Sequence, residues 1–135
     1  MKIYIATPVN GRKEATLDEK RIKAFERVNE IAVKLFERYP DAEIHSSFDQ
    51  DISPFSILKN PTEAEIMGKC VQRVMECDMI VLDSTCKESK GCVIELRTAD
   101  VYGKELRQVQ YEFVDDHFEI EIVEIPRVRI KGMKY

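Results

Sequence analysis

The chain has 135 residues, of which 44% are hydrophobic and 34% charged, a composition typical of a soluble globular protein rather than a fibrous or disordered one. This length predicts one domain, residues 1–135, whose core needs no disulfide for stability. The 21 Lys and Arg residues against 25 Asp and Glu residues give a formal net charge of -4, and no basic run stands out, which disfavours binding to nucleic acid or to an anionic membrane.

The apolar segments and the cysteines indicate the compartment. The apolar stretch at 1–6 is too short for the core of a signal peptide, and no later window approaches the length of a membrane span, so we expect a cytoplasmic protein. The cysteines form no C-x-x-C pair and no recognisable zinc pattern with a histidine. Four residues are therefore predicted to be reduced thiols, mostly buried: Cys70, Cys77, Cys86 and Cys92.

The first half of the chain predicts a strand, a long helix and a second, weaker strand. Residues 2–6 form a short apolar strand that leads into a turn-rich loop. Thr16 and Glu19 form a capping box, after which apolar residues recur at helical spacing as far as Pro40: Ile22, Phe25, Val28, Ile31, Ala32, Leu35 and Phe36. A weak strand is expected over 42–45. The segment 46–61 is too polar and aperiodic for regular structure, and a loop of that length is often functional.

The second half continues this alternation and then changes character. Thr62 caps a helix that ends near Cys77, and the apolar run 79–82 is typical of a strand buried on both faces. A polar loop precedes a further helix, which Gly103 can terminate. Strand-like segments over 106–114 and 118–125 flank a turn and predict a hairpin. We therefore expect an α/β domain with a mostly parallel sheet, flanked by helices, and a C-terminal antiparallel strand extension.

Two loops that follow predicted strands carry residues suited to ligand binding, because ligands of open α/β sheets lie beyond the carboxyl ends of the strands. The first loop contains Asn10, Gly11 and Arg12 ahead of a helix, where backbone N–H groups and a guanidinium can hold an anion or a sugar hydroxyl. A turn of this composition also forms without any ligand, so a plain connector is the alternative.

The second loop leads into the helix that carries Glu95. Ser89 can cap this helix, Gly91 allows a ligand to approach the backbone, and Glu95 lies one turn further along. The neighbours of Glu95 are apolar, so its carboxylate would be partly desolvated and able to act as a base or a nucleophile. The alternative is a carboxylate that the helix dipole favours without any chemical role.

Three stretches together carry a resemblance to a known family. They are Tyr4–Arg12, Cys77–Asp83 and Ser89–Leu96, the last followed by Ala99 and the pair Gly103-Lys104. In order and spacing they resemble the nucleoside 2-deoxyribosyltransferase superfamily, which includes the deoxynucleoside 5'-monophosphate N-glycosidases. The segment from Val109 onward has no counterpart in this resemblance.

The resemblance implies a flavodoxin-like or Rossmann-like domain that cleaves or transfers at the N-glycosidic bond of a nucleoside or nucleoside 5'-monophosphate, with no metal and no cofactor. Glu95 would attack the anomeric carbon as in a retaining glycosidase, and Tyr4 would orient that carboxylate. Ser89 and Gly91 match residues that hold the 5'-phosphate in the monophosphate N-glycosidases, and Arg12 suits the same phosphate. The other substrate-binding residues implied by the first matched stretch are Thr7, Asn10 and Gly11.

One position departs from the family pattern. Many members have an aspartate eight residues before the position of Asp78, where it supports sugar binding or protonation of the leaving base, and this chain has Cys70 there. A cysteine on an apolar helix stripe is typical of a core residue and replaces a carboxylic acid poorly. The acidic residues that could take over this role are Glu63, Glu65, Asp78 and Asp83. The capping box already explains Glu65, however, and the two aspartates that bound the buried strand can serve as caps or ion-pair partners instead.

Cys70 opens an alternative function of another class. A catalytically impaired nucleotide-binding module of the same fold, acting as a sensor or regulatory protein, would keep Ser89, Gly91 and Glu95 without turnover. A second carboxylate in the pocket of Glu95 would favour the enzyme instead.

The resemblance also implies assembly, because members of this superfamily complete their active sites with residues from a neighbouring subunit. We therefore expect a homodimer or a higher homo-oligomer. The last predicted strand offers an alternating apolar face for a partner to cover, formed by Phe118, Ile120 and Ile122.

Overall fold

The chain folds around a five-stranded sheet of order β2-β1-β3-β4-β5 in the computed structural model, which describes residues 1–9, 16–52, 62–83 and 89–125. The strands are β1 (Lys2–Ala6), β2 (Glu43–Ser46), β3 (Met79–Leu82), β4 (Glu105–Val114) and β5 (His117–Glu124). The first four run parallel, and β5 pairs antiparallel with β4. The predicted α/β class is confirmed, and the parallel strands have the order of a flavodoxin-like sheet.

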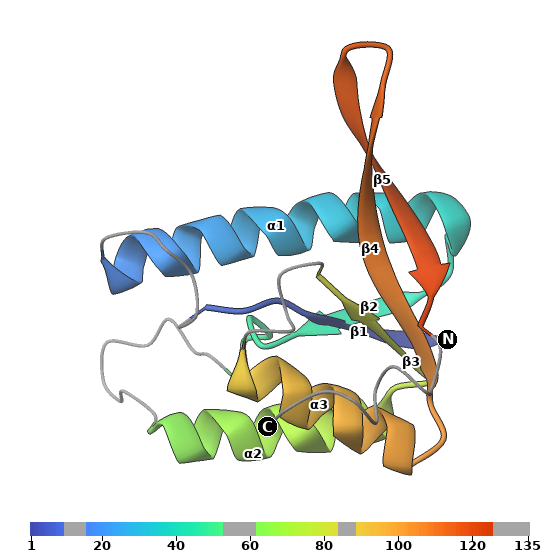
Figure 1. Cartoon of the computed structure of the whole chain (residues 1–135). Coiled ribbons are helices and arrows are strands. Elements are labelled where there is room, and N and C mark those ends of the chain that lie inside the picture. The colour runs from blue at the N-terminus through green and yellow to red at the C-terminus, as the bar shows by residue number, and fades with distance from the viewer. Residues whose placement is uncertain (10–15, 53–61, 84–88, 126–135) are drawn as a thin grey trace.

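Three helices cover the two faces of this sheet (Figure 1). α1 (Leu17–Arg38) lies on one face, and α2 (Glu63–Glu76) and α3 (Lys90–Val101) lie on the other. Each helix begins at a predicted cap, where the side chain of Thr16, Thr62 or Ser89 accepts a hydrogen bond from a backbone N–H three residues on. Among the helices of the described ranges, none has the length and apolarity needed to cross a membrane.

β1 is the central strand, and its alternation divides the core in two. Ile3 and Ile5 pack with α1, whereas Tyr4 and Ala6 pack with α2 and α3. All four side chains are buried, because helices cover both faces of the sheet at this central strand. Tyr4 therefore points toward the helices that the sequence associates with ligand binding.

α1 buries less of its apolar surface than its periodicity predicts. Val28, Ile31 and Leu35 are buried against the sheet as expected. Ile22, Phe25 and Phe36 share the predicted helical spacing, but their side chains are exposed. A helix contacts a sheet along one narrow face, and these three residues lie outside that face. The Phe25 ring instead meets the Phe48 ring edge-on, with 5.6 Å between the ring centres.

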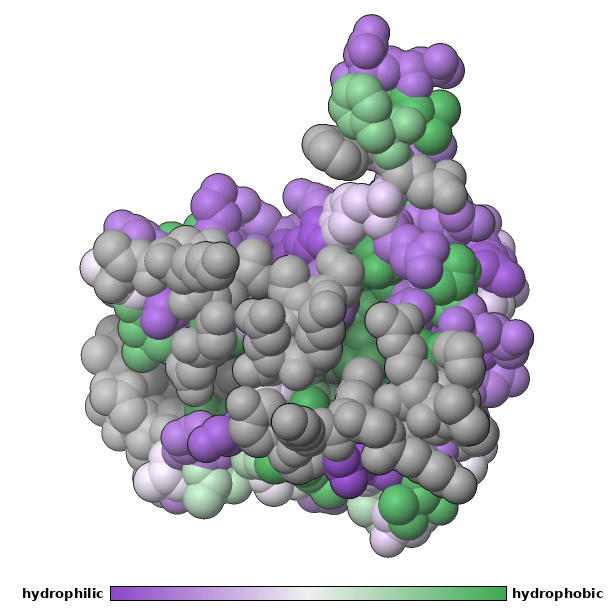
Figure 2. Space-filling view, in the orientation of Figure 1, coloured by the Kyte–Doolittle hydropathy of each residue, from purple (hydrophilic) through white to green (hydrophobic). Residues whose placement is uncertain are grey.

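The predicted C-terminal hairpin is confirmed. Asp115 and Asp116 make its turn with φ angles of 48° and 65°, the pattern of a two-residue hairpin loop. The end of the hairpin stands clear of the body (Figure 2). Nearer its base, Ile122 is buried, and Ile120 packs against the same core cluster as α1. The chain itself therefore covers these two residues of the strand face that we expected a partner subunit to cover. The side chain of Phe118 lies outside the described residues.

The cysteines agree with the expectation of reduced, buried thiols as far as the structure describes them. Cys70, Cys77 and Cys92 are free and buried. Cys86 lies outside the described residues. Burial raises the pKa of the Cys77 thiol to about 12, so this side chain is a neutral core residue.

Candidate functional site

A cavity of about 510 Å³ opens between the carboxyl ends of β1 and β2 and the starts of all three helices. This volume lies within the range of small-molecule sites. The cavity is lined from β1 and its loop by Thr7 and Val9, from α1 by Leu17 and Arg21, from the loop after β2 by Ser47 and Phe48, from α2 by Glu63, Ile66, Met67 and Cys70, and from α3 and its cap by Ser89, Lys90, Gly91, Cys92 and Glu95.

Glu95 is a buried carboxyl group in the wall of this cavity. It lies in the second turn of α3 and is only 6% exposed. Its Oε2 atom has no hydrogen-bond partner among the described residues. Burial raises the pKa of Glu95 to about 7, because removal from water disfavours the charged form, and the hydroxyl of Tyr4 acts in the opposite direction. Glu95 can therefore gain and lose a proton near neutral pH.

Tyr4 lies beneath Glu95, in the middle of β1. Its side chain is fully buried, and its pKa is raised well above the ordinary value, first by burial and then by the charge of Glu95. The phenol therefore keeps its proton at every physiological pH and can serve as a hydrogen-bond donor. Its Oη is close enough to lower the pKa of Glu95, yet neither Oη nor Glu95 Oε2 completes a hydrogen bond of standard geometry within the described structure.

Cys70 also faces this pair. It is part of the apolar core cluster, as its place on the α2 stripe predicts, and it lines the cavity as well. Burial, followed by the charge of Glu95, raises the pKa of the Cys70 thiol to about 12. The thiol is therefore neutral, and with this pKa it donates protons poorly at neutral pH.

The start of α3 supplies polar groups to the cavity. Ser89 Oγ accepts a hydrogen bond from the backbone N–H of Cys92 at 3.4 Å. A Cβ placed on Gly91 would meet Met67 Sδ at 3.6 Å, an ordinary contact, so packing does not require glycine at this position. What glycine adds is access for a ligand to the backbone at the positive end of the helix dipole.

Thr7 adds an unpartnered hydroxyl on the β1 side of the same cavity. The residue is 7% exposed, and its Oγ1 has no hydrogen-bond partner among the described residues. A buried hydroxyl without a partner is unfavourable unless a ligand or water completes it. Thr7, Ser89, Gly91 and Glu95 thus meet at one cavity, with Tyr4 beneath it, while the predicted site residues Asn10, Gly11 and Arg12 lie outside the described residues.

The structure places the four acidic residues that could replace the acid missing at Cys70 in different surroundings. Asp78 accepts a hydrogen bond from the backbone N–H of Lys2 at 2.8 Å. Asp83 pairs with the Arg27 guanidinium of α1, at 3.2 Å for each of two contacts. The backbone N–H of Glu65 donates to the side chain of Thr62 at the start of α2, and Glu65 does not line the cavity. Glu63 does line it. Glu63 is therefore the second carboxyl group of the described lining.

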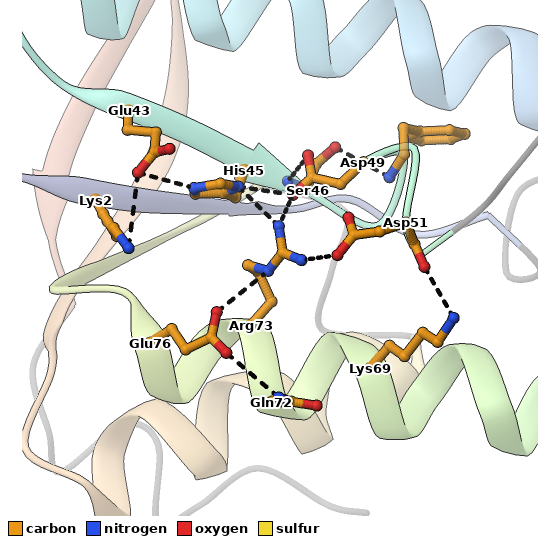
Figure 3. A network of polar contacts seen from close by, with 11 residues as sticks. Lys2, Glu43, His45, Ser46, Asp49, Asp51, Lys69, Gln72, Arg73 and Glu76 are labelled. Carbon is orange, nitrogen blue, oxygen red and sulfur yellow. Dashed lines mark hydrogen bonds and ion pairs between the residues drawn. The ribbon is translucent and has the colours of Figure 1, made fainter.

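A polar network fixes the loop that brings Ser47 and Phe48 to the cavity (Figure 3). Arg73 reaches from α2 to Asp49 at 2.7 Å and also pairs with Asp51. His45 Nδ1 contacts the same Asp49 carboxylate at 2.7 Å. The loop is thus held to α2 by a charged cluster of which Arg73 is the centre.

Several lining residues were not predicted. Phe48 falls in the segment 46–61, whose length marked it as functional, but nothing in the sequence singled out this side chain. Arg21 belongs to the first turns of a helix that periodicity describes only as amphipathic. Their meeting at one cavity depends on the sheet order, which sequence spacing does not contain.

Comparison of the chain with models of known protein families yields no match, and comparison with curated proteins yields no significant match. A functional assignment therefore depends on the chemistry of the cavity itself.

The raised pKa of Glu95 predicts a pH-dependent cost in stability. The folded state keeps the Glu95 proton up to about pH 7, whereas the unfolded chain loses it near the ordinary pKa of 4.5, so stability falls between these values as pH rises. We expect Glu95→Gln, which cannot ionise, to be more stable than wild type at pH 8 by up to about 3 kcal/mol, with the difference shrinking toward pH 4.

Urea unfolding at both pH values measures this difference. Glu121→Gln, at an exposed position of β5, is the matched control and should change stability by less than about 0.5 kcal/mol at either pH. Equal effects of Glu95→Gln at pH 4 and pH 8 would show that Glu95 is not held in an unfavourable ionised state.

Proposed function

We propose that this protein is a member of the nucleoside 2-deoxyribosyltransferase superfamily and cleaves the N-glycosidic bond of a nucleoside or nucleoside 5'-monophosphate, with Glu95 as nucleophile. The observation that carries this proposal is the Glu95 carboxyl group, buried in a cavity of ligand size, with an oxygen that has no partner among the described residues. A structural carboxylate at this depth would be expected to have its hydrogen bonds satisfied.

The proposed reaction proceeds in two displacements. A Glu95 carboxylate oxygen forms a bond to the anomeric carbon while the C–N bond breaks, and the electron pair of that bond leaves with the base, which takes up a proton. The resulting glycosyl ester is then attacked by water, giving hydrolysis, or by a second base, giving transfer. Two inversions at the same carbon retain the anomeric configuration.

Tyr4 is the proposed orienting group for this carboxylate. A neutral phenol that donates toward Glu95 favours the ionised form, which is the form that attacks. Because Tyr4 is fixed in the central strand, its hydroxyl keeps one place while the substrate binds and leaves.

Protonation of the leaving base is assigned to Glu63 in this proposal. Cys70, which occupies the family's aspartate position, is a neutral thiol that donates protons poorly at neutral pH. Glu63 lines the same cavity from the first turn of α2 and is the second carboxyl group in its described lining. Its presence favours an enzyme over a module that only binds.

The 5'-phosphate is assigned to the start of α3. Ser89 and Gly91 line the cavity there, and the helix dipole favours an anion. Arg21 adds a guanidinium from the opposite wall. Arg12 is proposed for the same phosphate from its place in the sequence.

A second candidate function is supported by Cys70 alone. A nucleotide-binding module without turnover would retain the cavity. Because it would need no proton donor, a neutral thiol could occupy the position of the acid. This candidate and the enzyme differ in one observable, which is release of free base.

A substrate panel tests the nucleophile. Nucleosides and their 5'-monophosphates are incubated with the protein, and free base is followed by chromatography. Glu95→Gln should lower base release by at least about a thousandfold with the fold intact, because the neutral amide cannot form the ester. The wild-type rate should rise with pH up to about pH 7, since attack needs the ionised Glu95 carboxylate.

The control for this experiment is again Glu121→Gln, which should keep the wild-type rate. Near wild-type turnover by Glu95→Gln would remove Glu95 from the mechanism. Binding without base release from any member of the panel would favour the module.

Phosphate recognition makes a separate prediction. Bound to Glu95→Gln, which prevents turnover, a nucleoside 5'-monophosphate should have a Kd about 10- to 100-fold lower than the matching nucleoside, as expected for a charge-assisted hydrogen-bonded contact. Calorimetry measures both constants, and added salt should narrow the gap. Equal affinities would contradict a phosphate site at the start of α3.

A further inference from the structure

The cavity has two sides of different chemistry. Large apolar side chains line it from α1, from the loop after β2 and from α2: Leu17, Phe48, Ile66 and Met67. The polar groups assigned above to the sugar and the phosphate come from the end of β1 and from α3. Because β2 and β3 flank β1 on opposite sides, the loop after β2 and the start of α3 reach the cavity from opposite sides. A ligand that fits both sides has a polar part and an apolar part.

Phe48 supplies the one aromatic ring in the described lining of the cavity. Its side chain is partly buried and packs against the core cluster beneath α1. The Phe25 ring of α1 meets it edge-on, with 5.6 Å between ring centres and 75° between ring planes, and Phe25 itself is not part of the lining. The Phe48 ring is therefore supported from outside the cavity while it borders the cavity, which makes it a platform for a flat aromatic group.

The turn that carries Phe48 is closed by hydrogen bonds at both of its ends. The backbone N–H of Phe48 donates to Ser46 Oγ, and that of Asp49 donates to the Ser46 carbonyl, each at 3.1 Å. In return, Asp49 Oδ1 accepts from the backbone N–H of Ser46 at 3.1 Å. Since Ser46 is the last residue of β2, the position of the ring depends on the strand and on the Asp49 carboxylate.

Arg73 connects this turn to α2 (Figure 3). Its Nη1 atom donates to Asp49 Oδ2 at 2.7 Å, the oxygen that His45 Nδ1 also contacts at 2.7 Å. The Arg73 side chain is 17% exposed and that of Asp49 18%, so the pair is shielded from water and stronger than a surface ion pair. One turn earlier on α2, Lys69 Nζ donates to the Asp51 carbonyl at 2.9 Å. These contacts fix the distance between the Phe48 wall and the wall that α2 provides.

We propose that Phe48 is a specificity-determining residue on which the base of the ligand stacks, and that Arg73 is a positioning residue that holds Phe48 in place through Asp49. This inference rests on the proposed function, which gives the ligand a base. Every base has a flat aromatic face, so stacking tolerates different bases. Phe48 therefore distinguishes a ligand that carries a base from the sugar phosphate that remains when the base is lost.

Calorimetry with two ligands tests the role of Phe48. The ligands are 2'-deoxyadenosine 5'-monophosphate and 2-deoxyribose 5-phosphate, which lacks the base, and both are titrated into Glu95→Gln so that nothing is cleaved. Phe48→Ala should raise the Kd of the nucleotide about 5- to 100-fold, as expected for one base on an aromatic ring, and leave that of the sugar phosphate within about twofold. Phe48→Tyr keeps the ring and should change either Kd by less than about threefold.

The matched control is Phe113→Ala, which makes the same chemical change at a position of β4 that is 64% exposed. Neither Kd should change in this variant. An increase of equal size for both ligands in Phe48→Ala would overturn the proposal, because it would show a role in the fold of the cavity and not in stacking.

A double-mutant cycle tests Arg73. Arg73→Met removes the guanidinium and keeps an apolar stem, and it should raise the Kd of the nucleotide about 3- to 10-fold. In Phe48→Ala the same change should have less than about a twofold effect, because no ring remains to be positioned. Asp49→Asn weakens the pair from the side of the turn and should behave alike, while circular dichroism verifies that each variant is folded. Equal effects with and without Phe48 would contradict positioning by Arg73.

This inference and the proposed reaction fail separately. Release of base by the wild type, together with a nucleotide Kd that Phe48→Ala leaves unchanged, would overturn the role of Phe48 and leave the reaction standing. Nucleotide binding that depends on the ring, without release of base from any compound, would support Phe48 and contradict the reaction. A nucleotide that does not bind to Glu95→Gln at all would overturn the role of Phe48.

Discussion

The hydrogen bonding of β1 to a parallel strand on both of its edges is the constraint on which the rest of the structure depends. It places Ile3 and Ile5 against α1 and turns Tyr4 toward α2 and α3. A shift of one residue in the register of β1 would exchange these two sets. The carboxyl end of the same strand delivers Thr7 to the cavity, so one strand fixes both the orienting phenol and one wall of the site.

The cavity contains buried polar groups that lower the stability of the fold, which a purely structural protein would avoid. Glu95 is buried beside a phenol and a thiol, and its Oε2, the Tyr4 hydroxyl and the Thr7 hydroxyl have no partner of standard hydrogen-bond geometry among the described residues. Replacing such groups with apolar ones normally stabilises a core, so their retention is better explained by binding or chemistry. The destabilised carboxyl and the proposed nucleophile are the same group.

Sequence periodicity and capping residues were enough to predict the element order, the hairpin and the α/β class, because these depend on local spacing. The burial of Glu95 followed from its apolar neighbours in the helix. Three features could not be predicted. Periodicity does not distinguish the half of the α1 apolar surface that meets the sheet from the half that faces outward, and it does not show that Glu63 and Phe48 meet at one cavity. The covering of Ile122 by its own chain depends on how the hairpin twists over α1.

Capture of a covalent intermediate on Glu95 tests the central claim most directly. The protein is quenched with acid during reaction with the panel compound that releases base fastest, then digested and analysed by mass spectrometry. A sugar ester on the peptide that contains Glu95, lost on treatment with mild base, is the expected result. Continued release of base while that peptide stays unmodified and another peptide carries the sugar would contradict the assignment of Glu95 as nucleophile.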